Sequence, residues 1–110
     1  MTDAAAAHAQ AVLEMYTGMP DTPDAARAFD RRTAADLYRR GVRLTVVETA
    51  LLLASLRRMI RPPESPAALP PIRSLAYFLP VIAELEAAPA PEGYLDYLRG
   101  KLIRGRRLPG

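Results

Sequence analysis

Residues 45–60 limit the possible folds of this chain more than any other segment. The run begins with a capping box, in which the Thr45 hydroxyl and the Glu48 carboxylate can bond free backbone N–H groups at a helix start. The helix then continues through Leu51–Ala54 and is apolar on every side. Because such a helix is stable only when other segments cover it all round, we expect a helical domain built around residues 44–60.

Helical signals recur in the rest of the sequence, and no alternating strand pattern is present. Thr22 and Pro23 are good candidates for the N-cap and first residue of a second helix, and a later helix should kink or restart at Pro80. These signals predict four further helices, over residues 3–17, 23–40, 74–87 and 92–103. The expected fold class is therefore all-α: a compact orthogonal bundle of about five helices, with the 44–60 helix buried at its centre.

Residues 61–71 contain five prolines in eleven positions (RPPESPAALPP), which is incompatible with a helix or a central strand. The segment is expected to be a stiff, extended connector. Neither side of it carries enough apolar residues for a separate core. We therefore predict one domain over 1–110, with 61–71 as an internal connector and 104–110 as a loose basic tail.

Candidate catalytic residues are sparse. The chain has no cysteine and a single histidine, His8, which is expected on the surface. Transition-metal sites need several ligands at set spacings, and no glycine-rich phosphate loop is present. The carboxylate pairs Asp21/Asp24 and Glu84/Glu86 are expected near helix ends or on exposed faces. We therefore expect neither an enzyme nor a protein that binds a cofactor or a metal.

The sequence also lacks the usual targeting signals. The first residues have no basic segment followed by a strongly apolar one, as a secretory signal would. The longest apolar runs are far shorter than the roughly 20 residues that cross a bilayer. We expect a cytoplasmic protein that does not enter the membrane.

Positive charge is concentrated in the middle third of the chain. Residues 31–61 contain eight arginines and two acids, whereas residues 1–30 contain one arginine and five acids. Arginine presents a planar fork of N–H donors that suits phosphate, and such contacts make nucleic-acid binding salt-dependent. We therefore expect nucleic-acid contact through these arginines: Arg31, Arg32, Arg39, Arg40, Arg43, Arg57, Arg58 and Arg61.

Part of this set has a plainer explanation. Arg39–Arg40 and Arg57–Arg58 fall in the last turns of predicted helices, where the helix dipole favours positive charge by about 0.3–1 kcal/mol. That explanation does not cover Arg31–Arg32, which fall in the middle of a predicted helix. An acidic protein partner is a further alternative to nucleic acid.

Residues 34–53 also have the spacing of a helix-turn-helix, because a glycine separates two predicted helices. Two features argue against it. Arg40 occupies the position before Gly41 where an apolar residue would pack the turn, and the second helix is apolar around Leu51–Leu53 instead of exposing a polar face to a groove. The aromatics Tyr77-Phe78 and Tyr94/Tyr97 could stack bases, but their helical spacing favours core positions.

Several runs resemble a poorly characterised group of bacterial proteins, either small helical proteins or C-terminal domains of longer ones. Members of this group accompany plasmid-type replication initiators and other mobile elements. The resemblance rests on LTVVETALLLASLRR (Leu44 to Arg58), LPPIRSLAYFLPVIAEL (Leu69 to Leu85), YLDYLRGKL (Tyr94 to Leu102), Asp21-Thr22-Pro23 and DRRTAADLYRRGV (Asp30 to Val42). It implies a DNA-associated accessory role, although the initiator domain of the longer relatives is not part of this sequence.

Two functional hypotheses follow. The first is a non-enzymatic, nucleic-acid-associated accessory module of a mobile element that contacts phosphate through the arginine clusters. The second is a protein–protein interaction module, such as a homodimer, that uses surplus apolar surface of the 44–60 and 74–87 helices and has no affinity for nucleic acid.

Overall fold

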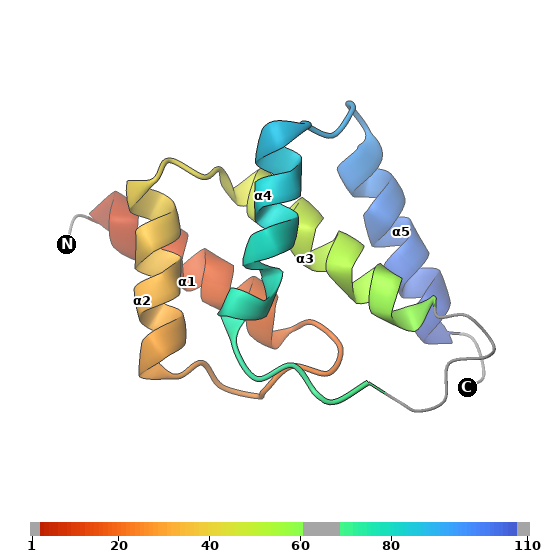
Figure 1. Ribbon diagram of the computed structural model, residues 1–110, viewed down its shortest axis with the longest axis horizontal. Helices are drawn as coiled ribbons and strands as arrows, with labels where there is room; N and C mark the ends of the chain where they lie inside the picture. The colour runs from red at the N-terminus through yellow and green to blue at the C-terminus, as the bar shows by residue number, and fades with distance from the viewer. Residues whose placement is uncertain (1–2, 61–68, 108–110) are drawn as a thin grey trace.

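Helix α3 (Leu44–Met59) runs through the middle of the molecule, and the other helices lie around it (Figure 1). The computed structural model describes residues 3–60 and 69–107. The remaining elements are α1 (Asp3–Thr17), α2 (Ala28–Arg39), the 3-10 helix η1 (Leu75–Phe78), α4 (Leu79–Ala87) and α5 (Tyr94–Arg107). The all-α class is confirmed, since every regular element in these residues is helical.

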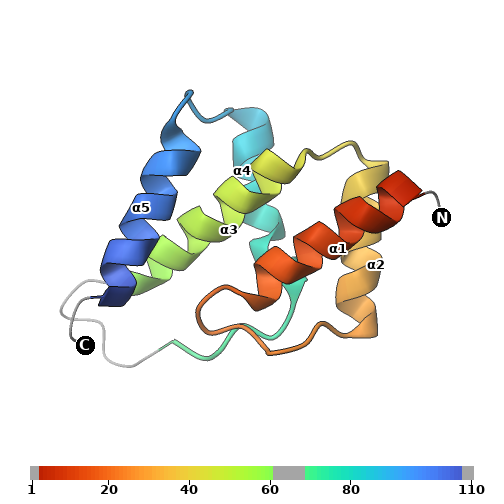
Figure 2. The same cartoon turned by 180° about the vertical axis from the view of Figure 1, so that it is seen from behind.

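The central position predicted for the 44–60 helix is confirmed. Helix α3 packs against α1, α4, α5 and η1, and Figure 2 shows α1 beside α3 and α4 behind it. Its middle, from Val47 to Leu56, is buried except for the partly buried Glu48 and Leu53. Only its two ends are exposed.

The main core fills the space between α1, α2, η1, α4 and the first half of α3. Its largest fully buried side chains are Tyr16, Phe78, Leu37 and Leu51. The rings of Tyr16 and Phe78 meet edge to face, with centroids 6.1 Å apart, which is a favourable aromatic geometry. This contact joins the end of α1 to η1.

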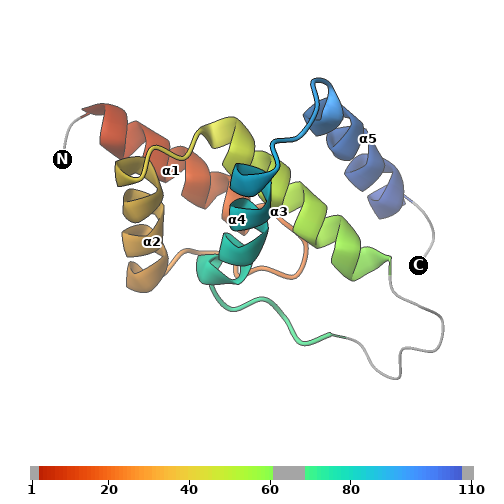
Figure 3. The same cartoon turned by 45° about the horizontal axis from the view of Figure 1, so that its top comes forward.

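Helix α5 is attached through a second, smaller cluster. Leu52 and Leu56 of α3 pack against Leu98 and Leu102 of α5. Figure 3 shows α5 alongside α3 and apart from α1 and α2. Since its packing is almost entirely against α3, α5 forms an outer layer of the bundle.

The predicted start of α2 at Pro23 is wrong, because the helix begins five residues later, at Ala28. The Thr22 hydroxyl donates to the carbonyl of Met19 instead of capping a helix. The first turn is fixed by Asp30, whose Oδ2 accepts the backbone N–H of Arg27 at 2.9 Å. The other oxygen of the same carboxylate accepts the backbone N–H of Leu75, and this tertiary contact favours the later helix start.

The predicted capping box at Thr45 and Glu48 is also wrong. Helix α3 begins at Leu44 with Arg43 as its N-cap, so Thr45 already lies inside the first turn. The Thr45 carbonyl accepts a hydrogen bond from the Thr49 hydroxyl. Glu48 turns away from the helix start and receives two hydrogen bonds from Arg99 of α5, each 2.7 Å long.

The later elements keep the predicted order with shifted boundaries. The restart at Pro80 is confirmed, because Pro80 is the second residue of α4 and η1 precedes it. Helix α5 continues through Gly105 to Arg107, so the prediction of a loose tail is wrong for residues 104–107 and lies outside the described residues for 108–110. Of the predicted connector, residues 69–71 are extended, and residues 61–68 lie outside the described part.

Candidate nucleic-acid interface

The arginines predicted to bind nucleic acid fall into two separate groups. Arg31, Arg32 and Arg39 belong to α2, and Arg40 and Arg43 lie in the turn that follows it. The second group, Arg57 and Arg58, lies in the last turn of α3. Figure 1 shows α2 and the end of α3 toward opposite ends of the longest axis, which measures 47 Å. Arg61 lies outside the described residues.

Arg57 is held by a carboxylate of the same molecule. Its two terminal nitrogens donate to Oε2 and Oε1 of Glu84 on α4, each at 2.9 Å. These hydrogen bonds raise the pKa of Arg57 and lower the pKa of Glu84. A phosphate at Arg57 would therefore compete with a bidentate ion pair that is already formed.

Arg58 is a structural residue, with only 9% of its side chain exposed. Its guanidinium donates to the Pro70 carbonyl at 2.8 Å, to the Tyr77 hydroxyl at 3.3 Å and to Asp21 Oδ2 at 3.4 Å. The hydrogen bond to Tyr77 raises the pKa of Arg58. Arg58 therefore ties the end of α3 to two segments far from it in sequence, and its donors are directed inward.

The α2 group is more open. Arg31 and Arg32 are both exposed, and neither forms a salt bridge within the described residues. Arg31 donates to the carbonyl of Ala26 at 3.4 Å, and the Arg32 guanidinium lies 5.6 Å from the centre of the exposed Phe29 ring. These guanidinium groups keep free donors toward solvent.

The remaining arginines of this group differ from one another. Arg39 pairs with Asp36 one turn back at 3.1 Å but stays largely exposed. Arg40 pairs with Glu86 of α4 at 3.3 Å. Arg32 and Arg39 are seven residues apart, so they project from the same outward side of the helix, whereas Asp30, Ala34 and Leu37 face the core.

Two arginines that the sequence analysis did not single out join this end of the molecule. Arg27 and Arg73 line the same hollow of about 410 Å³, together with Asp21, Thr22 and Ile72. Both are exposed, and neither forms a salt bridge within the part of the chain that the structure describes. Sequence gives no signal for this pairing, because 46 positions separate two isolated arginines. We call the whole set the α2 basic surface: Arg27, Arg31, Arg32, Arg39 and Arg73.

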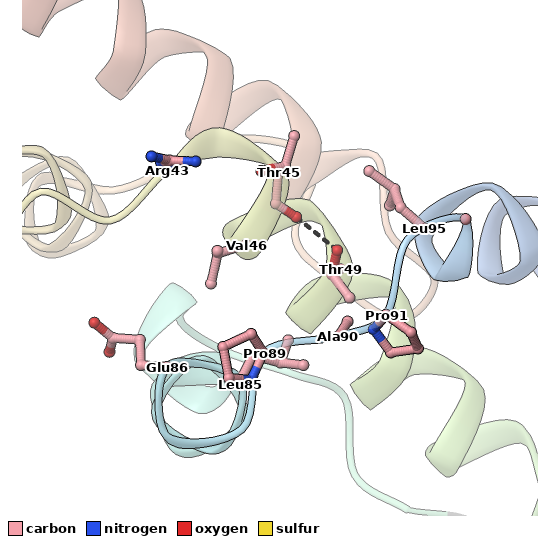
Figure 4. Close-up of a pocket in the computed structure, with 11 residues that line it drawn as sticks. Arg43, Thr45, Val46, Thr49, Leu85, Glu86, Pro89, Ala90, Pro91 and Leu95 are labelled. Atoms are coloured by element: carbon pink, nitrogen blue, oxygen red, sulfur yellow. Dashed lines mark hydrogen bonds between the residues drawn. The ribbon is translucent and has the colours of Figure 1, made fainter.

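Arg43 lies apart, at the rim of a different hollow of about 460 Å³ (Figure 4). Arg43 and Glu86 lie on one side of this hollow, and its other lining residues are Thr45, Val46, Thr49, Leu85, Pro89, Ala90, Pro91, Gly93 and Leu95. The Thr49 hydroxyl is already bonded to Thr45. The hollow therefore offers apolar contact and no reactive group.

Two expectations about ring side chains need correction. His8 is partly buried and not fully exposed as expected, since its Nε2–H donates to the Val42 carbonyl at 2.9 Å and its ring packs edge-on against Tyr38. Tyr77 and Tyr97 are exposed, so the prediction that they belong to the core is wrong, while Phe78 is a core residue as expected. The amphipathic spacing of tyrosine does not distinguish a core ring from one at the rim of a groove.

The described residues contain no group of three or more His, Cys, Asp or Glu side chains that could hold a metal ion. None of the helices in this part of the chain is both long and apolar enough to cross a membrane. Comparison with protein-family models, curated proteins and solved structures gives no match.

Proposed function

We propose that this protein is a non-enzymatic accessory module that binds nucleic acid through phosphate contacts made by the α2 basic surface. One observation carries the proposal: Arg31 and Arg32 project from an outer helix without a carboxylate partner in the described residues, and Arg27 and Arg73 lie beside the start of that helix. The family resemblance of the sequence supports a role beside the replication machinery of a mobile element.

The expected binding is independent of base sequence. Phosphate contacts fix the position of a protein on a duplex, whereas base contacts in the grooves read the sequence. Helix α3, the second helix of the helix-turn-helix considered above, is enclosed by α1, α4 and α5 and cannot enter a groove in this conformation. The surface therefore provides charge and position, and specificity would have to come from a partner.

Salt dependence gives the expected magnitude. Each neutralised phosphate adds about −0.9 to the slope of log affinity against log salt. Four contacts would therefore weaken binding roughly 100-fold between 50 and 200 mM salt. Arg57 and Arg58 should contribute little, because their donors are already used within the molecule.

The test is fluorescence anisotropy with a labelled 20-base-pair duplex of arbitrary sequence. The variant Arg31→Glu with Arg32→Glu should bind at least ten times more weakly than wild type and show a salt slope smaller by about two. The matched control, Lys101→Glu with Arg104→Glu on α5, makes the same change in net charge. Equal losses in both variants, or no binding of wild type at 50 mM salt, would refute the proposal.

A further inference from the structure

A groove between α3 and α5 exposes apolar side chains that the proposed nucleic-acid contacts do not use. It measures about 310 Å³. Ile60 and Tyr97 stand at its edges and are 72% and 53% exposed. Its remaining lining comes from Leu53, Leu56, Tyr94 and Leu98, with Arg57 and Lys101 as the charged members. We call this set the α3–α5 groove.

The apolar lining of the groove follows the direction of α3. Leu53, Leu56 and Ile60 are spaced three and four residues apart, so they form one stripe about 10 Å long. Beyond Arg57 a second hollow of about 270 Å³ continues toward α4, with the exposed Leu69 and Tyr77 in its lining. An occupant can therefore lie across more than one turn of α3.

The charged groups that line this surface are cations, and one of them, Arg57, is already paired with Glu84. Neither hollow includes an Asp or Glu in its lining. Lys101 lies over the Tyr97 ring, 5.9 Å from its centre, and forms no salt bridge within the described residues. Arg57 is fixed in place by Glu84 between the two hollows. The groove thus combines an aliphatic floor with one cation, Lys101, that has no carboxylate partner among the described residues.

We propose that the α3–α5 groove docks an amphipathic helix of a partner protein, with apolar residues facing the groove and carboxylates on its flanks. In helix-in-groove recognition the docked helix presents apolar anchors at spacings of three, four and seven residues, and the stripe on α3 is long enough to contact about two turns of such a helix. The Lys101 ammonium, which has no salt bridge within the described residues, gives the acidic flank a counter-charge. The exposed area of Ile60 and Tyr97 supplies anchors of the size that dominates such interfaces.

Two other occupants fit less well. A symmetric second copy would bring Lys101 to both sides of the contact, with no acid in the lining of either groove to offset it. Single-stranded nucleic acid needs open aromatic faces, whereas the Tyr97 ring is stacked with Tyr94 and overlain by Lys101, and the floor is aliphatic.

The experiment is selection from two display libraries of 16-residue amphipathic peptides with randomised apolar positions. One library carries Glu on the polar face and the other carries Lys at the same positions. We expect enrichment from the Glu library only. The selected peptides should lose at least ten-fold in affinity for Lys101→Glu and for Ile60→Glu, and should bind the control variant Arg32→Glu as tightly as wild type.

The outcomes separate this proposal from the others. No enrichment, equal enrichment from both libraries, or peptides indifferent to Lys101→Glu and Ile60→Glu would overturn it. An oligouridine probe that competes with the peptides and is lost with Tyr97→Ala would assign the groove to nucleic acid instead. Concentration-dependent dimerisation in sedimentation, abolished by Ile60→Glu, would assign it to a second copy. Duplex binding by the α2 basic surface can succeed or fail independently of all these results.

Discussion

Asp30 on α2 accepts a hydrogen bond of 2.9 Å from the backbone N–H of Leu75, 45 residues further along the chain. Its other carboxylate oxygen caps the start of α2 through the N–H of Arg27. The carboxylate is almost fully buried. This one side chain therefore fixes both the start of α2 and the start of η1, and it brings Arg73 beside Arg27.

Replacing Asp30 by Asn should destabilise the fold. The amide would place an N–H₂ group against one of two backbone donors, leaving a buried donor without a partner. The expected loss is about 2–4 kcal/mol in the free energy of unfolding, measured by urea denaturation. Asp36→Asn is the matched control, because the Asp36 carboxylate is half exposed and pairs with Arg39 on the surface, and it should change stability by less than about 0.5 kcal/mol. Similar values for both variants would contradict the role given to Asp30.

Arg58→Ala should destabilise the fold, whereas the same substitution at an exposed arginine should not. Removing this guanidinium leaves the Pro70 carbonyl and the Tyr77 hydroxyl without their donor, so we expect a loss of about 2–3 kcal/mol. Arg58→Lys should restore little, since an ammonium cannot reproduce the planar fork. Arg32→Ala, measured in the same denaturation series, should stay within about 0.5 kcal/mol of wild type. If Arg58→Ala left the free energy of unfolding unchanged, Arg58 would again be a candidate phosphate ligand.

The Arg57–Glu84 pair should make stability depend on acid pH. The pKa of Glu84 is lowered in the folded state, so its contribution is complete above the pKa of the unfolded state and disappears as pH falls through the folded pKa. Arg57→Gln should therefore be less stable than wild type at pH 7 and equal to it in strong acid. NMR titration of the Glu84 carboxyl carbon should show its pKa rising in Arg57→Gln and unchanged in Arg39→Gln.

Tyr16 should make stability depend on alkaline pH. Burial raises the pKa of its phenol to about 12, with the Asp30 charge adding to the effect, while the unfolded chain ionises near the ordinary value of 10.0. Stability is therefore complete below pH 10 and falls between pH 10 and 12, by on the order of 2 kcal/mol. Tyr16→Phe removes this part of the fall in stability, and it also removes a buried hydroxyl that has no hydrogen-bond partner among the described residues. Parallel pH curves for the two proteins would rule the assignment out.

Helix α5 should open before the rest of the fold. Leu102→Ala removes one of the four leucines that hold α5 on α3, at a cost of about 2–5 kcal/mol to that contact. Hydrogen exchange followed by mass spectrometry should show faster exchange in residues 94–105 and unchanged exchange in α1 and α2. Leu37→Ala, in the main core, should instead accelerate exchange in every helix.

The helical class and the central helix could be predicted because they depend on local periodicity. The bounds of α1 match the expectation of residues 3–17, and Gly41 follows α2 with a φ of 77°, the left-handed conformation that glycine favours. The start of α2 could not be predicted, because the local signal at Thr22 and Pro23 is overridden by the distant contact of Asp30 with Leu75.

The candidate site shows the same division. The sequence identifies arginines of the right chemistry, but it does not show which of them already have partners. Glu84 and Glu86 reach Arg57 and Arg40 only because α4 packs against α3, and Arg73 joins Arg27 only through the tertiary fold. Whether a charged group is free to bind a ligand depends on tertiary packing, which patterns in a single sequence do not show.

The attachment of α5 has a consequence for recognition. Two leucines from each helix hold α5 against α3. The ion pair of Glu48 with Arg99, near the middle of α5, adds only a surface contact. Helix α5, which forms the outer side of the α3–α5 groove, is therefore held less firmly than α3, the most deeply buried helix, which forms the floor. We therefore expect that a small outward movement of α5 could make room for a wider binding partner without disturbing the main core.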